Sequence, residues 1–117
     1  MIRIALLATA LSGLTAIPAG AASFDCAKAS APDEIAICRN PVLSERDTEM
    51  AALWFAYSKI PMMMGGNGNR HDAARDFLAQ RAACGGNVAC LQSAYDARIA
   101  TLKSDIPAAL GNACNNP

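Results

Sequence analysis

The chain has 117 residues, of which ten are basic and ten are acidic, so its formal net charge at neutral pH is zero. Without an excess of positive charge it lacks the field that draws basic proteins to nucleic acids and anionic membranes, and we expect neither as a partner. Its length predicts a single domain, small enough for cross-links to contribute much of the stability.

The first 22 residues have the three parts of an export signal. Arg3 supplies a positive charge, residues 4–17 form an apolar run, and residues 19–21 form the small-residue cleavage pattern Ala-Gly-Ala. The apolar run is shorter than the ~20 residues that a membrane-spanning helix needs. We therefore expect cleavage after residue 21 or 22 and a soluble mature chain, without membrane insertion, that is periplasmic or secreted.

All five cysteines follow this signal. In an oxidising compartment they are expected to form disulfides rather than to bind metals or act as nucleophiles. Because five is an odd number, one thiol stays unpaired. Choosing that thiol in five ways and pairing the other four in three ways gives 15 arrangements, and the spacing of the cysteines does not select one.

Two helices are expected in the first half of the mature chain. The first is short, begins near Pro32 with Ser30 as its cap, and ends close to Asn40, where the following proline disfavours helical geometry. The second helix begins at Pro41, with Asn40 or Ser44 as its cap.

The second helix carries apolar residues spaced three and four apart along one face; these are Leu43, Met50, Leu53, Trp54, Tyr57 and Ile60. Asp47 falls on the same face. A carboxylate in an apolar stripe needs a partner, because an unpaired buried charge costs several kcal/mol or is neutralised by protonation. Asp47 is therefore a candidate for a buried ion pair.

Residues 61–70 combine three consecutive methionines with three glycines. Glycine at this density disfavours a helix, so we expect an exposed, mobile loop. Methionine side chains adapt to varied surfaces, which makes this loop the candidate partner-binding segment. Its candidate contact residues are Pro61, Met62, Met63, Met64, Asn67 and Arg70.

A third helix is expected from a cap formed by Asn69 with Asp72 to the glycine pair at residues 85–86. Its inward face comprises Ala74, Phe77, Leu78 and Arg81. It is joined to the next helix by a short elbow of small residues that carries a cysteine on each side.

A fourth helix begins at Asn87 and has the most regular amphipathic pattern of the chain. Arg98 lies near the edge of its apolar face. The inward residues of this helix are Val88, Leu91, Tyr95, Ile99, Leu102 and Ile106. Pro107 is expected to end the helix, leaving residues 108–117 as a loose tail that contains Cys114.

No stretch alternates with period two, so the fold class is all-α, a small disulfide-stabilised bundle of three to four helices. The domain covers residues 23–107, between the signal and the tail. In an antiparallel bundle the start of the second helix and the end of the third lie together, which brings Asp47 near Arg81. We expect Asp47, Arg81 and Arg98 to form an internal ion pair cluster rather than an exposed recognition patch.

Metal binding and catalysis are weaker hypotheses. The three methionines at residues 62–64 and the single histidine, His71, are ligand types that suit Cu(I), but the methionines have no repeated spacing and we expect no metal or other cofactor. We also expect no enzymatic activity. His71 lies at a predicted helix start, the cysteines are assigned to cross-links, and no carboxylate pair has a spacing that suggests acid and base roles.

One further pattern extends from Phe24 to Leu102. Its residues are Phe24, Asp25, Cys26, Ala27, Lys28, Ala29, Glu34, Ile37, Cys38, Leu43, Asp47, Arg75, Phe77, Leu78, Arg81, Cys84, Cys90, Leu91, Tyr95, Arg98, Ile99 and Leu102. This order of cysteines and arginines resembles the LprI-like lysozyme-inhibitor domain family, a group of small bacterial exported helical domains. The resemblance implies a periplasmic or cell-surface domain and, for some relatives, inhibition of lysozyme by direct binding.

The resemblance also implies two disulfides among Cys26, Cys38, Cys84 and Cys90. We prefer Cys38 with Cys84 and Cys26 with Cys90; the alternative is Cys26 with Cys84 and Cys38 with Cys90. Cys114 is then free, pairs with another chain, or displaces one of the four.

The expected function is that of an exported protein-binding domain, with lysozyme as the partner that the resemblance suggests and occlusion of the enzyme cleft by residues 61–70 as the mechanism. The alternative is an envelope-associated structural or interaction module without inhibitory activity. Either form is a monomer or a dimer linked through Cys114.

Overall fold

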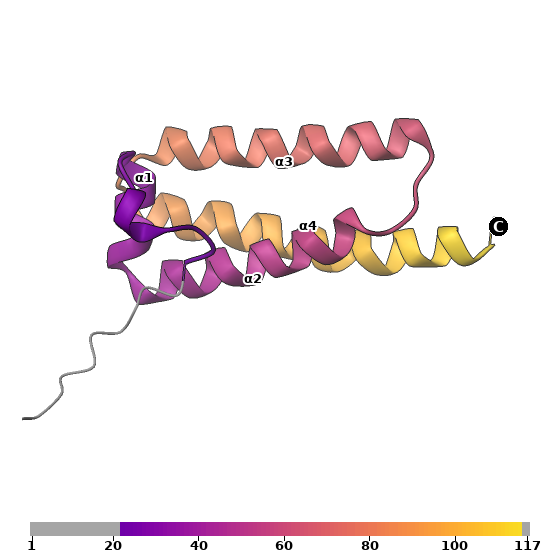
Figure 1. Cartoon of the computed structure of the whole chain (residues 1–117), viewed down its shortest axis with the longest axis horizontal. Helices are drawn as coiled ribbons and strands as arrows, with labels where there is room; N and C mark the ends of the chain where they lie inside the picture. The colour runs from indigo at the N-terminus through magenta and orange to yellow at the C-terminus, as the bar shows by residue number, and fades with distance from the viewer. Residues whose placement is uncertain (1–21, 116–117) are drawn as a thin grey trace, which may run out of the picture.

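The computed structural model describes residues 22–115, so the expected export signal lies outside the described residues apart from Ala22. Within this range the chain is helical and has no strand: a 3-10 turn, η1 (Cys26–Lys28), precedes α1 (Pro32–Arg39), α2 (Pro41–Ser58), α3 (Met64–Cys84) and α4 (Val88–Asn115). The expected small all-α bundle, stabilised by disulfides, is confirmed (Figure 1).

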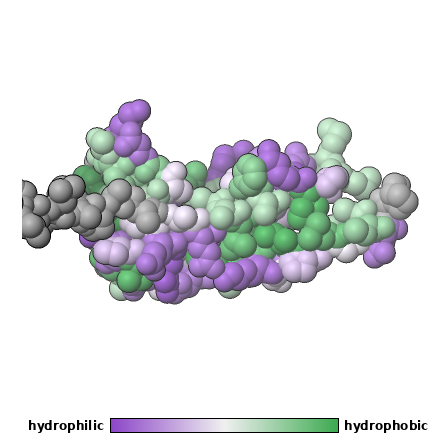
Figure 2. Space-filling view, turned by 60° about the horizontal axis from the view of Figure 1, so that its bottom comes forward, coloured by the Kyte–Doolittle hydropathy of each residue, from purple (hydrophilic) through white to green (hydrophobic). Residues whose placement is uncertain are grey.

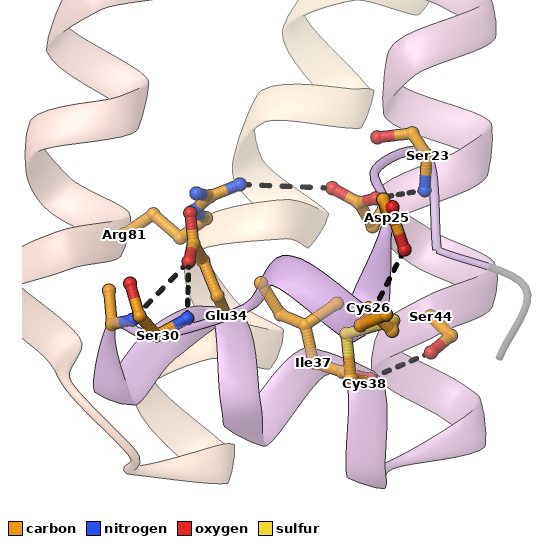
Figure 3. The surroundings of a disulfide bond; sticks show 12 residues. Ser23, Asp25, Cys26, Ser30, Glu34, Ile37, Cys38, Ser44 and Arg81 are labelled. Carbon is orange, nitrogen blue, oxygen red and sulfur yellow. Dashed lines mark hydrogen bonds and ion pairs between the residues drawn. A yellow bond between two sulfur atoms is a disulfide. The ribbon is translucent and has the colours of Figure 1, made fainter.

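The corner between α1 and α2 lies at Asn40, as the sequence predicts. Asn40 has extended backbone angles, and its Oδ1 accepts a hydrogen bond from the backbone N–H of Leu43 at 3.1 Å. Asn40 is therefore the cap of α2. Ser44, the alternative cap, instead donates from its hydroxyl to the carbonyl of Ile37 at 2.7 Å, which ties the end of α1 to the start of α2 (Figure 3).

The start of α1 differs in one detail from the expectation. Its N-cap is Ala31, not Ser30. The Oε2 atom of Glu34 accepts hydrogen bonds from the backbone N–H groups of Ser30 and Ala31, at 3.1 and 3.3 Å. The Glu34 carboxylate thus pairs with two backbone N–H groups just before the first turn, and it also lies at the favourable end of the helix dipole.

The core lies mainly between α2 and α4, which run side by side, with α1 across one end and α3 packed on α4 (Figure 1). Phe77 of α3 contacts Tyr95 of α4 edge-on, with ring centroids 5.2 Å apart. Leu78 and Val88, expected to face inward, are 49% and 38% exposed. Because α3 packs mainly on α4 and α1, its buried stripe is narrow, and Val88 lies in the first turn of α4, beyond the centre of the core.

The methionine and glycine segment is not a mobile loop. The irregular link between α2 and α3 is short, α3 begins at Met64, and residues 65–70 belong to that helix. Asn69 and Asp72 accordingly do not cap the helix; Met63 is the N-cap residue and makes no side-chain cap bond. The prediction of a loop over residues 61–70 was therefore wrong for all but its first residues.

Arg70 explains why a glycine-rich segment is helical here. Its side chain is buried, its Nη1 donates to the carbonyls of Tyr57 and Ile60, both at 2.8 Å, and its Nε donates to Oδ1 of Asn67 at 2.9 Å. These bonds join the first turns of α3 to the C-terminal end of α2. The free energy from tertiary contacts of this kind outweighs the low intrinsic helix propensity of glycine.

Replacing Arg70 with methionine is expected to lower the free energy of unfolding by about 2–4 kcal/mol, because two carbonyls lose a charged donor. Urea unfolding followed by circular dichroism measures the loss. The matched control is Arg75→Met on the same helix, where the guanidinium is exposed and pairs with Asp72; it should change stability by less than about 1 kcal/mol. Equal effects of the two substitutions would contradict the role given to Arg70.

α4 does not end at Pro107 but continues to Asn115, so the expected loose tail is helical over residues 108–115, while residues 116 and 117 lie outside the described range. A proline inside a helix removes one backbone hydrogen bond. The apolar stripe continues past it, however: Ala109 is buried against Tyr57 and Ile60 of the second part of the core. Burial of this last part of α4 offsets the local cost of the proline.

The disulfides join Cys26 to Cys38 and Cys84 to Cys90, with Cα atoms 5.8 and 5.6 Å apart. Neither expected pairing occurs, although all four cysteines are used. The chain before α1 folds back so that η1 lies beside the end of α1 (Figure 3). Cys114 is free and exposed.

The turn between α3 and α4 brings the other two cysteines together. Gly85 has a positive φ of 54°, a conformation that residues with a side chain rarely adopt. Asn87 then caps α4, because its Oδ1 accepts from the backbone N–H of Cys90 at 3.0 Å. The chain reverses within a few residues, and the local pairing of Cys84 with Cys90 means that neither of them cross-links to α1.

Candidate functional site

Asp47 lies at the centre of a buried polar cluster, here called the Asp47 cluster, which comprises Asp47, Tyr95, Arg81, Asp33 and Ser23. Its carboxylate is fully buried. One oxygen accepts from the Tyr95 hydroxyl at 2.8 Å and the other from the backbone N–H of Ser23 at 2.6 Å. The Nη1 atom of Arg81 is 3.9 Å away. The expected ion pair between Asp47 and Arg81 is therefore present, as a longer contact than the two hydrogen bonds.

The shorter partner of Arg81 is Asp33, whose Oδ2 lies 2.8 Å from the arginine Nε. The Arg81 guanidinium also lies over the ring of Phe24, 5.7 Å from its centroid. In Figure 3 Arg81 extends from its own helix toward the segment that carries Ser30 and Glu34. The sequence does not distinguish Asp33 as the partner of Arg81, because a first-turn carboxylate favours the helix dipole whether or not another helix packs on it.

The side chains at the centre of the Asp47 cluster, Asp47 and Tyr95, are closed to solvent. Burial raises the pKa of Tyr95, and the hydrogen bond to Asp47 raises it further, so the phenol stays protonated and donates. Asp47 and Tyr95 both have no exposed surface. We therefore assign this cluster to holding the four helices together.

Arg98 does not belong to the Asp47 cluster, and the expectation that it would was wrong. It lies one turn beyond Tyr95 along α4, and its guanidinium is 5.9 Å from the centre of the Trp54 ring. Its Nε and Nη2 atoms are buried and have no hydrogen-bond partner among the described residues. Burial lowers the pKa of Arg98 from its ordinary value.

The link between α2 and α3 lies at the opposite end of the bundle from α1 (Figure 1). An apolar groove, here called the distal groove, lies beside this link. It has a volume of about 790 Å³ and lies between the start of α3 and the C-terminal part of α4; its lining residues are Pro61, Met62, Met63, Gly66, Ala109, Asn112 and Ala113. No charged side chain is among them. The prediction of a loose tail over residues 108–117 did not include the α4 residues of this groove, which belong to a helix.

Two methionines beside the distal groove are almost fully exposed, Met63 at 90% and Met64 at 92%. Leu110 on α4 is exposed as well. Figure 2 shows apolar side chains gathered on the half of the molecule that holds the C-terminal part of α4. Exposed apolar surface next to a groove is typical of a protein contact.

The six residues expected to form the partner-binding loop therefore divide into two groups. Pro61, Met62 and Met63 line the distal groove, and Met64 lies beside it. Asn67 and Arg70 instead bond to each other and to the end of α2, so they are structural. The prediction was wrong about the conformation of the segment, and its role in binding a partner stays a prediction.

The copper hypothesis finds no support in the position of the histidine. The ring of His71 packs edge-on against Trp54, with centroids 5.4 Å apart. Among residues 22–115, no group of three or more His, Cys, Asp or Glu side chains is placed to hold a metal ion. In the same range, no helix is long and apolar enough to cross a membrane.

Comparisons with family models, with curated proteins and with solved structures gave no match. The likeness to the LprI-like lysozyme inhibitors is therefore carried by the residues quoted above alone, and it stays a prediction.

Proposed function

We propose that this chain is an exported protein-binding domain that contacts its partner through the distal groove and the methionines beside it. The observation that carries the proposal is the near-complete exposure of Met63 and Met64 next to an uncharged groove of about 790 Å³. Flexible thioether side chains in such a place suit a protein surface that must repack on contact. The two disulfides are consistent with an oxidising compartment.

The specific form of the proposal is inhibition of lysozyme, which the resemblance implies. The inhibitor would occlude the enzyme cleft with residues 61–64, now a short link and helix start in place of a mobile loop. Such an element loses less conformational entropy on binding than a loop. Because the formal net charge is zero, affinity would come from apolar contact rather than from electrostatic steering toward a basic enzyme.

A lysis assay tests this proposal. The clearing of bacterial cell walls is followed with the oxidised protein over a panel of lysozyme types, and stoichiometric inhibition is expected for at least one type. The double substitution Met63→Ser and Met64→Ser should weaken inhibition at least about tenfold, as expected when apolar contacts central to an interface are lost. It should leave the melting temperature unchanged, because both side chains are exposed.

Leu78→Ser is the matched control, since Leu78 is an exposed apolar residue on α3 outside the distal groove. It should leave inhibition unchanged. Absence of inhibition at a large molar excess over every lysozyme would reject the lysozyme form of the proposal. Equal loss with the control and the methionine variant would reject the distal groove as the contact.

The alternative function is an envelope-associated structural module that assembles through Cys114. This thiol is free and exposed, and it follows Asn112 and Ala113 of the distal groove. Size-exclusion chromatography separates the two hypotheses. A dimer that reducing agent or Cys114→Ser dissolves, together with a lack of lysozyme inhibition, would favour assembly.

A further inference from the structure

The backbone nitrogen of Ser23 lies on the buried Asp47 carboxylate, next to the position at which the export signal is expected to end. It is 2.6 Å from Oδ2 of Asp47 (Figure 3). The sequence leaves cleavage after residue 21 or residue 22 open. Cleavage after residue 22 would make this same nitrogen the N-terminal amino group of the mature chain. Such a group is mostly protonated at neutral pH, because its ordinary pKa is about 7.7–8.0.

The Asp47 cluster holds two buried carboxylates and one basic side chain. Asp47 and Asp33 are both buried, and among residues 22–115 Arg81 is the only basic side chain within ion-pair distance of either. The arginine is 2.8 Å from Asp33 but 3.9 Å from Asp47, so its closer pair is with Asp33. The short contacts of Asp47 come from a hydroxyl and a peptide N–H, which are neutral donors. Asp47 thus lacks the close cation that stabilises a buried carboxylate.

The segment that carries the Ser23 nitrogen is held in place on both sides of the Asp47 cluster. Phe24 packs against the core, and the Arg81 guanidinium lies over its ring, 5.7 Å from the centroid. Cys26 is cross-linked to Cys38 of α1. Ser23 itself is exposed, so water can accept hydrogen bonds from the two N–H groups that cleavage adds. A new ammonium group would therefore stay at Asp47.

Cleavage after residue 21 would not have this result. Ala22 would then carry the ammonium, and Ser23 would keep a neutral peptide N–H on Asp47. Ala22 packs against the core, so its removal loses the contact of one methyl group. That loss is smaller than the gain at Asp47, since hydrogen bonds from charged donors are about twice as strong as those from neutral donors.

We propose that a signal peptidase hydrolyses the peptide bond between Ala22 and Ser23, and that the ammonium this creates is the second cation of the Asp47 cluster. Water adds across the bond, which leaves a carboxylate on Ala22 and an ammonium on Ser23. Removal of the signal then completes the charge balance of the core. The proposal rests on the export signal expected in residues 1–22. It makes no use of the distal groove, so it is independent of the proposed protein-binding function.

The mass of the exported protein gives the first test. The full 117-residue chain is expressed in a bacterial host, and the exported product is analysed by intact-mass spectrometry. The expected species comprises residues 23–117 with both disulfides formed. A product that begins at Ala22, or at any residue other than Ser23, would overturn the proposal.

The contribution of the ammonium is measured on two oxidised chains that differ by one residue, one starting at Ser23 and the other at Ala22. Each is released from a fusion partner by a protease that leaves no extra residue. In urea at neutral pH the unfolding equilibrium constant of the Ser23 form should be at least about fivefold smaller, because a charged donor replaces a neutral one at Asp47. Equal constants for the two forms would contradict the proposal.

Two substitutions, each made in both forms, attribute this difference to Asp47. Asp47→Asn keeps the size of the side chain but removes its charge, so the two forms should then differ by less than about twofold. Glu49→Gln neutralises an exposed carboxylate of the same helix and should leave the difference intact. A difference that persists in Asp47→Asn would show that the ammonium acts elsewhere.

The pKa of the Ser23 amino group provides a measurement that does not depend on the folding of any variant. It is read from the carbon-13 shift of the Ser23 Cα as the pH is raised. The amino group faces the Asp47 cluster, whose charged and titratable groups are Asp47 of α2, Asp33 of α1, Arg81 of α3 and Tyr95 of α4. Burial raises the pKa of Tyr95, so the phenol stays neutral in this range. The two carboxylates outnumber the one guanidinium, and they should raise the pKa of the amino group above its ordinary value of about 7.7–8.0.

The sign of the resulting pH dependence follows from this shift. A group whose pKa is higher in the folded state stabilises the fold below its ordinary pKa. The advantage of the Ser23 form should therefore be complete below about pH 7 and be lost as the pH rises through the raised value. An amino group that titrates at or below its ordinary pKa would overturn the pairing with Asp47.

Discussion

Replacing Asp47 with alanine is expected to lower the free energy of unfolding by about 3–5 kcal/mol, the range seen when one partner of a buried charged pair is removed. The substitution takes the acceptor from the Tyr95 hydroxyl and the Ser23 N–H, and removes one of the two carboxylates that pair with Arg81. Because native domains are stable by only about 5–15 kcal/mol, this loss would be a large share of the total stability.

Urea unfolding of the oxidised protein measures the effect, and two controls define its origin. Tyr95→Phe removes one hydrogen bond while keeping the ring packed against Phe77, and should cost about 1–2 kcal/mol. Glu49→Ala removes an exposed carboxylate of the same helix that pairs with Lys103, and should cost less than about 1 kcal/mol. Parent-like stability of Asp47→Ala would show that the Asp47 cluster does not hold the helices together.

Asp47 also provides a way to separate stability from binding. The Asp47 cluster joins α1 to the end of α3 through Asp33 and Arg81, at the disulfide end of the bundle, whereas the distal groove is lined by the start of α3 and the end of α4. The folded fraction of Asp47→Ala should therefore bind a partner at the distal groove with the same affinity as the parent protein.

Removing both disulfides is expected to cost about 5 kcal/mol in the chain-entropy model, with about 3 kcal/mol from Cys26–Cys38 and about 2 kcal/mol from Cys84–Cys90. The contributions differ because the paired residues are 12 and 6 positions apart in the chain. Two double variants test this order, one with both Cys26 and Cys38 replaced by alanine and one with both Cys84 and Cys90 replaced. The melting temperature should fall further in the first variant than in the second.

Cys114→Ala is the control, because it removes an exposed free thiol and should leave the melting temperature unchanged. The pairing itself can be read from a tryptic digest of the unreduced protein. The fragment of residues 82–98 contains both Cys84 and Cys90, so it should appear alone, lighter by two hydrogens than its reduced form. Linkage of this fragment to one that contains Cys26 or Cys38 would contradict the structure.

The helices themselves were largely predictable, because the signals that determine them are local. Asn40 and Pro41 mark the start of α2, and the stripe of Leu91, Tyr95 and Leu102 buries α4 as expected. A cap or an amphipathic stripe depends on residues within one or two turns, and such patterns can be recognised without knowing what packs on them.

The ends of α3 and α4 were not predictable in this way. Gly65 and Gly66 argue against a helix, and Pro107 argues for a helix end, yet both segments are helical. In each case a distant contact compensates: Arg70 bonds to the end of α2, and Ala109 packs into the core. A local preference of about 1 kcal/mol per glycine is small beside such contacts.

The candidate sites show the same division. Asp47 and Arg81 could be paired from their positions on inward stripes, but a stripe does not say how far along the bundle each side chain lies. Arg98 has the same periodicity as Tyr95 but lies one turn farther on, and it contacts Trp54 instead of Asp47. Asp33 could not be recognised as the partner of Arg81, since its local role at the start of α1 already explained it.

The sequence by itself determined an all-α chain with buried faces on each long helix, a carboxylate that needs a partner, and four cysteines available for disulfides. Only the tertiary structure decided which cysteines pair. It also decided that Met63 and Met64 lie at a helix start beside a groove, not in a mobile loop, and that the Arg98 Nε and Nη2 atoms have no hydrogen-bond partner among the described residues. The physical reason is range. Helix caps and amphipathic periodicity depend on residues close in the sequence. Disulfide pairing, side-chain burial and the presence of an unpaired polar atom depend on which helices approach one another in space.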